Sequence, residues 1–106
     1  MLYELRQYTC QAGQRDAVVK CMEEEVIPFQ VSCGMVILAS FTGEDKADNY
    51  VWIRRFKDEA EREVLYEKVY QSDHWKNVIG PKIGPLLDRT GINVTRLTPT
   101  AKSPLQ

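Results

Sequence analysis

The sequence predicts a single α+β domain built on one antiparallel sheet. Stretches in which side chains alternate at period two, as in β-strands, occur four times along the chain. Stretches in which apolar residues recur at offsets of three and four, as in helices, follow the first and the third of these. The length of 106 residues, with 43% hydrophobic and 27% charged residues, fits one ordinary globular domain.

The first strand is expected over residues 2–9, and a helix is expected after a turn at Gly13. Glycine tolerates a positive φ, which suits this turn. Pro28 lacks a backbone N–H, so we expect it to kink or close the helix. The apolar face of this helix consists of residues at helical spacing: Val18, Cys21, Met22, Val26 and Phe29.

Two further strands are expected over residues 35–42 and 50–56, joined by a polar hairpin loop. Asp58 and Glu61 then have the spacing of a capping box. This pair predicts a helix that begins after Asp58 and runs to about Val69.

A further helical segment is expected after Ser72 or Asp73. Two Gly-Pro pairs, at 80–81 and 84–85, interrupt its apolar pattern, so the second helix is expected to be split. The last strand is expected over residues 92–97.

The order β-α-β-β-α-β is that of the ferredoxin-like plan, in which helices cover one face of an antiparallel sheet. We expect this domain over residues 1–98, followed by a loose tail over residues 99–106. The plan leaves the other sheet face bare, and we place Leu2, Tyr8 and Trp52 on that bare face. Two copies are therefore expected to pack sheet against sheet as a homodimer, with the polar members of the face around an internal cavity.

Charged and aromatic side chains share one face of two predicted strands. Glu4, Arg6 and Tyr8 alternate on the first strand, and Trp52 and Arg54 alternate on the third. Two interpretations are open. These side chains line a cavity, or Glu4 pairs with an arginine of a neighbouring strand and no ligand is involved.

Several short motifs follow one another along nearly the whole chain: Tyr3-Glu4-Leu5-Arg6 with Tyr8, Gly13, Asp73-His74-Trp75, Ile83-Gly84-Pro85-Leu86-Leu87, and Arg96-Leu97 followed by Pro99. In this order and spacing they resemble the NIPSNAP family. One departure is His74, where many members of that family have a small acid such as glutamate.

The resemblance implies a dimeric α+β barrel but no uniform chemistry. Relatives in fold include monooxygenases that act on quinols without a cofactor, haem-degrading enzymes and simple ligand-binding proteins. The favoured function is a homodimer that binds a small apolar or aromatic ligand in a cavity between the sheets. A quinol-type or haem-handling monooxygenase and a structural or regulatory dimer without a ligand are the alternatives, so enzymatic activity is left open.

The candidate ligand-binding residues are Arg6, Tyr8, Trp52 and Arg54. Arg6 could hold a carboxylate or phenolate through paired N–H donors, and Tyr8 could donate a hydrogen bond to the same group. Trp52 could stack on a planar ligand or fill the dimer interface.

The candidate catalytic residues are His74 and Glu4. His74 is the only imidazole in the chain, and it is a candidate general base or axial haem ligand. The alternative for His74 is an exposed position at a helix start. We assign no cofactor and no metal, because one histidine and three cysteines without C-x-x-C spacing give no zinc pattern.

Composition argues against several functions. Fourteen basic and fifteen acidic residues give a net charge of −1 with no basic block, so no nucleic-acid partner is expected. The longest apolar stretch, residues 35–39, is too short to span a membrane. Charged residues at Glu4 and Arg6 do not fit a signal peptide, and we expect a cytoplasmic protein with reduced cysteines.

Overall fold

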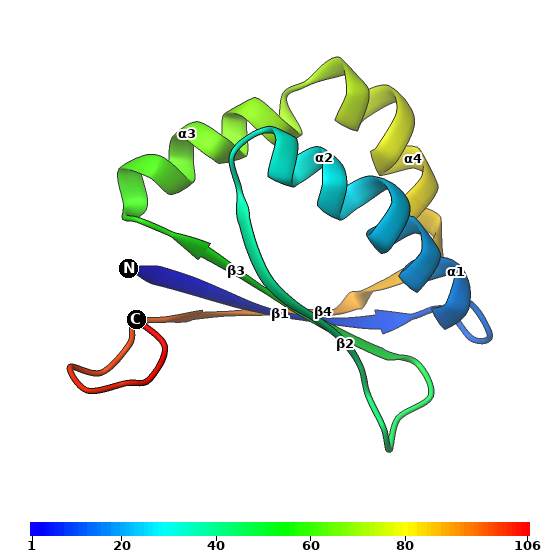
Figure 1. The fold of residues 1–106 in the computed structure, drawn as a ribbon. Coiled ribbons are helices and arrows are strands. Elements are labelled where there is room, and N and C mark those ends of the chain that lie inside the picture. Colours follow the sequence, from blue (N-terminus) through cyan, green and yellow to red (C-terminus); the bar gives the residue numbers. More distant parts are fainter.

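The computed structural model describes residues 1–106. Four strands, β1 (Leu2–Cys10), β2 (Val36–Thr42), β3 (Asn49–Phe56) and β4 (Leu87–Leu97), form one sheet in the order β2-β3-β1-β4, and every neighbouring pair is antiparallel. All helices lie on one side of this sheet (Figure 1). The structure confirms the predicted ferredoxin-like α+β fold.

The first helical unit is a continuous helix with an irregular middle. Helix α1 (Arg15–Cys21) passes through a π-helical turn (Met22–Val26) into α2 (Ile27–Ser32). The irregularity lies directly before Pro28, whose ring clashes with the carbonyl four residues earlier in a regular α-helix. The wider turn relieves this conflict without ending the helix, so the predicted kink takes the form of a π-helical turn.

The second helical unit is split, as predicted. Helix α3 (Glu59–Tyr70) begins at Asp58, whose carboxylate accepts a hydrogen bond from the Glu61 N–H at 2.8 Å. A π-helical turn (Trp75–Ile79) leads into α4 (Gly80–Ile83) and a 3₁₀ turn (Gly84–Leu86).

The register of β1 and β3 determines which side chains the helices cover. Glu4 lies opposite Arg54, and Arg6 lies opposite Trp52. Both pairs face the helices, and Trp52 is only 1% exposed within the single chain. The prediction that Leu2, Tyr8 and Trp52 lie on the bare face is therefore wrong. Alternation along a strand separates two faces, but it does not say which of them the helices cover.

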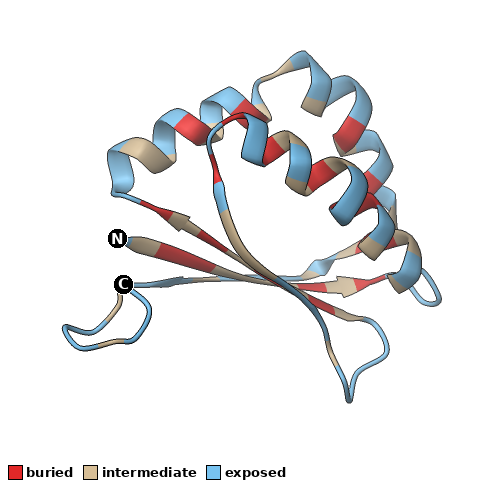
Figure 2. Ribbon diagram, viewed as in Figure 1, coloured by how far each residue is buried: buried red, intermediate tan, exposed pale blue.

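The uncovered face carries apolar side chains of β1, β2 and β3. Val51 and Ile53 of β3 and Leu5 of β1 are half-buried there. Phe41 of β2, opposite Val51, is 53% exposed. In Figure 2, strand β3 shows buried positions alternating with partly exposed ones, and the outer faces of the helices are exposed.

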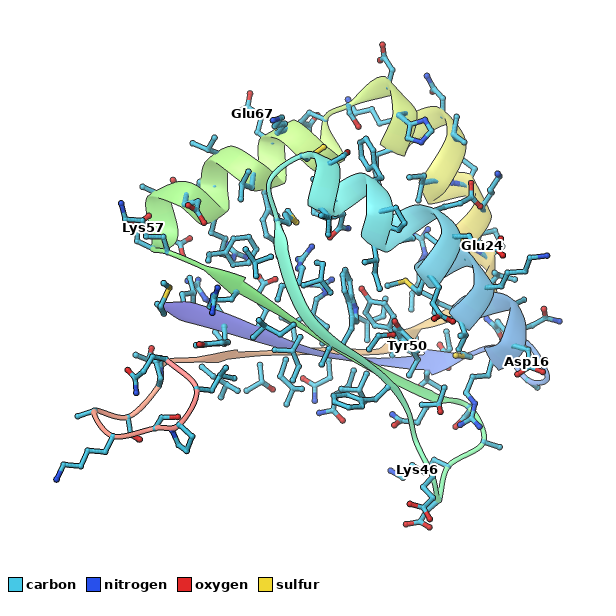
Figure 3. The ribbon with its side chains drawn as sticks, in the orientation of Figure 1. Asp16, Glu24, Lys46, Tyr50, Lys57 and Glu67 are labelled. Atoms are coloured by element: carbon cyan, nitrogen blue, oxygen red, sulfur yellow. The ribbon has the colours of Figure 1, made fainter.

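The core lies between the sheet and the helices. Figure 3 shows acidic side chains such as Asp16, Glu24 and Glu67 directed outward from the helices, whereas Tyr50 lies between helix and sheet. After β4 the chain turns back, and the carbonyl of Gln106 accepts a hydrogen bond from the hydroxyl of Tyr3. None of the helices has the length and apolar character that a bilayer span requires.

Candidate functional site

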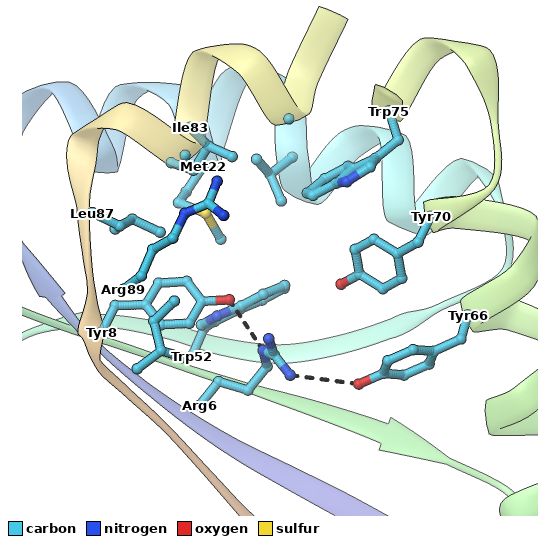
Figure 4. A pocket seen from close by; sticks show the side chains of 14 residues that line it. Arg6, Tyr8, Met22, Trp52, Tyr66, Tyr70, Trp75, Ile83, Leu87 and Arg89 are labelled. Atoms are coloured by element: carbon cyan, nitrogen blue, oxygen red, sulfur yellow. Dashed lines mark hydrogen bonds between the residues drawn. The ribbon is translucent and has the colours of Figure 1, made fainter. Parts of the chain in front are cut away.

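A cavity of about 300 Å³ lies between the sheet and the helices of the single chain. Its lining combines polar groups from β1, α3 and β4 with apolar groups from the helical turns (Figure 4). The sequence predicted a cavity between the sheets of two copies. This cavity instead opens on the helix-covered face, because the polar side chains of β1 and β3 point toward the helices. The residues that line it are Arg6, Tyr8, Met22, Val26, Trp52, Tyr66, Tyr70, Trp75, Gly80, Ile83, Gly84, Leu87, Arg89 and Ile92.

Next to the cavity, a buried ion pair joins β1 to β3. The guanidinium of Arg54 donates from Nη2 to Glu4 Oε1 at 2.6 Å and from Nε to the same oxygen at 3.0 Å. Both side chains are fully buried. The second carboxylate oxygen of Glu4 accepts from Arg62 Nε at 2.8 Å and from the Tyr66 hydroxyl at 2.5 Å. The alternative in which Glu4 pairs with an arginine of a neighbouring strand is thus present in the structure.

The remaining donors of Arg54 are also satisfied. Its Nη1 donates to Gln30 Oε1 at 2.9 Å and to the Tyr70 hydroxyl at 2.8 Å, and its Nη2 donates to the Tyr66 hydroxyl at 2.6 Å. A buried charge is tolerated only when such partners replace water. We call Glu4, Arg54, Arg62, Tyr66 and Gln30 the buried cluster.

The buried cluster holds Glu4 in its charged form. Burial by itself would raise the pKa of this carboxyl. The charge of Arg54 and the hydrogen bonds from Tyr66, Arg62 and Arg54 outweigh that effect and lower the pKa to about 2. A carboxylate with such a low pKa and occupied oxygens is a weak base, so this setting does not favour the predicted role of Glu4 in proton abstraction.

The second group of polar side chains borders open space. Arg6 Nε donates to the Tyr8 hydroxyl at 3.1 Å, and Arg6 Nη1 lies 3.4 Å from the Tyr66 hydroxyl (Figure 4). The closest carboxylate oxygen to Arg6 is Glu4 Oε1, 3.8 Å away and already bound by Arg54. Arg6 therefore retains donors for a further partner.

Trp52 forms part of the cavity floor beside Arg6. The Arg6 guanidinium carbon lies 5.7 Å from the centre of the Trp52 ring, in the range of a cation–π contact. The indole Nε1–H of Trp52 is buried without a hydrogen-bond partner. Such a group is uncommon in a folded chain and is costly to leave unpaired.

Arg89 reaches the cavity because β4 contains a bulge. Between the pairs Gln7–Asn93 and Thr9–Asp88, one residue of β1 faces four residues of β4. Gly91 lies in this bulge against Thr9, where a side chain would collide. The bulge changes the direction in which side chains leave β4 at this point. Arg89 extends from the bulge into the cavity (Figure 4).

The predicted site residues fall into three places. Arg6, Tyr8 and Trp52 line the cavity together. Arg54 lies behind the cavity wall and donates hydrogen bonds to the hydroxyls of Tyr66 and Tyr70, which line the cavity. His74 lies outside the cavity, is exposed, and packs its ring 4.9 Å from that of Phe29.

Sequence reasoning missed the contributions of α3 and of the β4 bulge. Arg62, Tyr66 and Tyr70 are spaced by four and form one stripe of α3 that faces the sheet. That spacing was a usable signal for this stripe. Arg89 had no comparable signal, because its position depends on the bulge.

Comparison with known proteins gives a family but no activity. The family model described as NIPSNAP matches residues 3–104. No curated protein shows significant similarity to the chain. A NIPSNAP family protein of unknown function from Agrobacterium tumefaciens is 26% identical over 100% of this chain and 94% of its own, with a TM-score of 0.89.

Two further structures support the fold alone. A second NIPSNAP family protein from Agrobacterium tumefaciens is 20% identical over 99% of this chain and 98% of its own, with a TM-score of 0.89. A structure described as an antibiotic biosynthesis monooxygenase is 18% identical over 94% of this chain and 99% of its own, with a TM-score of 0.69.

Proposed function

The chain belongs to the NIPSNAP family, and we propose that its cavity binds a small anionic molecule with an aromatic or apolar body. The proposal differs from the sequence-based expectation in one respect. The binding site is the space between sheet and helices within one chain rather than a space between two sheets.

One observation carries this proposal: the cavity lining contains two arginines and no carboxylate. Arg6 and Arg89 both line the cavity, and Asp and Glu are absent from the lining residues. Arg6 shares its nearest carboxylate, Glu4, with Arg54 and Arg62. A guanidinium favours an anionic oxygen as its partner, and an anionic ligand would supply one.

The size and the lining support a molecule of about two rings. The volume of about 300 Å³ is roughly twice that of an engineered cavity of about 150 Å³ that holds benzene. The wall opposite Arg6 is apolar, with Met22, Trp75 and Ile83 among its residues. Flat apolar walls of this kind suit an aromatic body.

Binding is favoured over catalysis because the cavity lacks a suitable base. Neither an imidazole nor a carboxylate is among the lining residues, and His74 is exposed outside it. Burial raises the pKa of the Tyr66 hydroxyl, so this group stays protonated at neutral pH and supplies no phenolate that could act as a base. The likeness to a structure described as a monooxygenase supports a shared fold, and quinol or haem chemistry stays an alternative.

We also propose that two copies associate through the uncovered sheet face. Half-buried Ile53 and Val51 and the exposed Phe41 are apolar groups that a second sheet would cover. A stable association of this kind buries upwards of about 2,000 Å² in total. Sedimentation at micromolar concentration should give the mass of a dimer, and a monomer would contradict this part of the proposal.

The direct test of the cavity is calorimetry with 2-naphthoate, a two-ring aromatic acid. We expect saturable binding to the wild-type protein and at least tenfold weaker binding to the double variant Arg6→Met/Arg89→Met, since a charge-assisted hydrogen bond contributes about 1.5–3 kcal/mol. Lys68→Met is the matched control, because it removes a cation from the exposed side of α3. Equal binding by the wild type and this double variant, or no binding to the wild type, would contradict the proposal.

A further inference from the structure

We infer that the ligand is a two-ended aromatic acid, with an acceptor oxygen at the inner end of the cavity and its carboxylate at the mouth. The inner oxygen accepts hydrogen bonds from Tyr8 and Tyr70, and the carboxylate binds Arg89. This inference rests on the proposed function, since it assigns an orientation and a second functional group to a ligand of the same cavity.

The inner end is defined by two hydroxyl groups that have a proton to donate. The Tyr8 hydroxyl accepts from Arg6 at 3.1 Å, and the Tyr70 hydroxyl accepts from Arg54 at 2.8 Å. Neither hydroxyl donates to an acceptor of the protein. A phenol has a single O–H donor, and an arginine facing its oxygen leaves that proton directed elsewhere. Figure 4 shows the two hydroxyls pointing toward one another across the cavity.

Tyr66 differs from Tyr8 and Tyr70 in that its hydroxyl has an acceptor within the protein. Its hydroxyl also accepts from an arginine, Arg54, at 2.6 Å, but it donates to Glu4 at 2.5 Å. Its hydrogen-bonding capacity is therefore used within the protein. Tyr8 and Tyr70 present the same arginine-backed phenol without the carboxylate, so an oxygen of the ligand is the fitting acceptor.

The mouth is defined by Arg89, which borders both the cavity and an outer groove. This groove, of about 590 Å³, shares Tyr70, Trp75 and Arg89 with the cavity and adds the exposed Lys76. No carboxylate lines it. If the carboxylate of the ligand lay at the mouth, it would contact the cations of Arg89 and Lys76 and would stay partly in contact with water.

Gly84 leaves room for the guanidinium of Arg89 at this place. A Cβ atom on Gly84 would lie 3.0 Å from Arg89 Nη2, which is closer than real Cβ atoms usually approach a neighbour. The backbone of Gly84 is helical, with φ −54° and ψ −49°, so the backbone itself would accept alanine. The close approach of the guanidinium is thus a physical reason for glycine at a position where helices disfavour it.

The test uses four naphthalene probes that separate the two ends. The compound 6-hydroxy-2-naphthoate carries both oxygens at opposite ends, 2-naphthoate lacks the inner oxygen, and 2-naphthol lacks the acid. The fourth, 3-hydroxy-2-naphthoate, carries both groups on adjacent carbons. We expect the first to bind tightest in calorimetry, about tenfold tighter than each of the others, because it alone satisfies both ends.

Variants assign each end to its residues. Arg89→Met should weaken 6-hydroxy-2-naphthoate about tenfold and leave 2-naphthol unchanged, and Arg89→Lys should restore part of the loss. Gly84→Ala should weaken the acids without removing any charge. Tyr8→Phe and Tyr70→Phe should weaken the two probes with an inner hydroxyl and leave 2-naphthoate unchanged. The thermal midpoint of each variant checks that it remains folded.

The outcomes separate this inference from the proposed function. If none of the acids binds, the proposed function fails. If the acids bind but 2-naphthoate and 6-hydroxy-2-naphthoate bind equally, the inner acceptor is wrong and the proposed function stands. If Arg89→Met weakens neutral 2-naphthol as much as it weakens the acids, Arg89 does not bind the carboxylate.

Discussion

Two groups of arginine and tyrosine lie side by side under the helices, and they differ in one partner. In the buried cluster, Arg54 meets the carboxylate of Glu4, and all of its N–H groups face acceptors. Further along β1, on the same face, Arg6 and Tyr8 border a cavity. No carboxylate is paired with these two residues alone. Arginine and tyrosine thus stabilise the fold where a carboxylate accepts their hydrogen bonds. Where no carboxylate does so, their N–H and O–H groups remain available to a ligand.

The largest effect expected from this comparison is on stability. Arg54→Met leaves Glu4 buried without its main counter-charge, and we expect a loss of about 3–5 kcal/mol in the free energy of unfolding. Arg6→Met removes a charge from a cavity wall and should cost less than about 1 kcal/mol. Urea unfolding measures both losses. Equal losses would mean that Arg6 contributes as much to stability as Arg54 does, which would contradict the comparison.

The second effect is a loss of stability in acid. The pKa of Glu4 is about 2 in the folded chain and 4.5 as its ordinary value, so the folded chain binds this proton less readily. A carboxyl of this kind stabilises the fold above pH 4.5, and the contribution is lost as the pH falls toward 2. We expect a loss of about 3 kcal/mol across this range from Glu4.

Glu4→Gln provides the control for the acid effect. This variant should be less stable than the wild type at pH 7 and should lose less stability between pH 5 and pH 2. Unfolding curves at a series of pH values give both quantities. Parallel pH profiles for the two proteins would show that Glu4 is not the titrating group.

The third prediction compares the two faces of β3. Trp52→Ala should cost about 3 kcal/mol of folding stability, near the low end for a buried tryptophan because a cavity already adjoins it. Ile53→Asp, on the uncovered face, should weaken self-association and change the stability of the single chain less. Thermal unfolding and sedimentation of both variants are the measurements, and a dimer weakened only by Trp52→Ala would reverse our assignment of the faces.

The last prediction tests the element that carries Tyr66 and Tyr70. Asp58→Ala removes the side chain that accepts from the Glu61 N–H at the start of α3. We expect a loss of about 1 kcal/mol in stability. Because the change lies far from the cavity, the affinity for 2-naphthoate should stay the same. A large loss of affinity would mean that the cavity depends on the start of this helix.

The fold could be predicted because its signals are local. Strand alternation, the Asp58–Glu61 spacing and the prolines act within a few residues, and the structure confirms the order of the elements that they predict. The last strand is longer than predicted, because β4 begins at Leu87 rather than at residue 92 and includes a bulge that interrupts the alternation. The covered face of the sheet could not be identified in this way. Arg54 reads as a surface residue until Glu4, Gln30 and the tyrosines of α3, 12 to 50 positions away, supply its partners.

The site was predictable only in part for the same reason. Arg6 and Tyr8 are neighbours on one strand face, so their proximity follows from the sequence. Arg89 enters the cavity through a bulge that forms only when β4 pairs with β1. The availability of the Tyr70 proton depends on a contact with Arg54 that no spacing rule encodes.

The two π-helical turns have a consequence for how such a cavity can arise. Met22 and Val26 belong to the first of these turns and Trp75 to the second, and all three line the cavity. A π-helical turn contains one residue more than a regular α-helical turn. Removing one residue from either turn would rotate the following helix by about 100° and carry its inward side chains away from the cavity. The extra residue in each of the two turns therefore sets which helical side chains form this wall of the cavity.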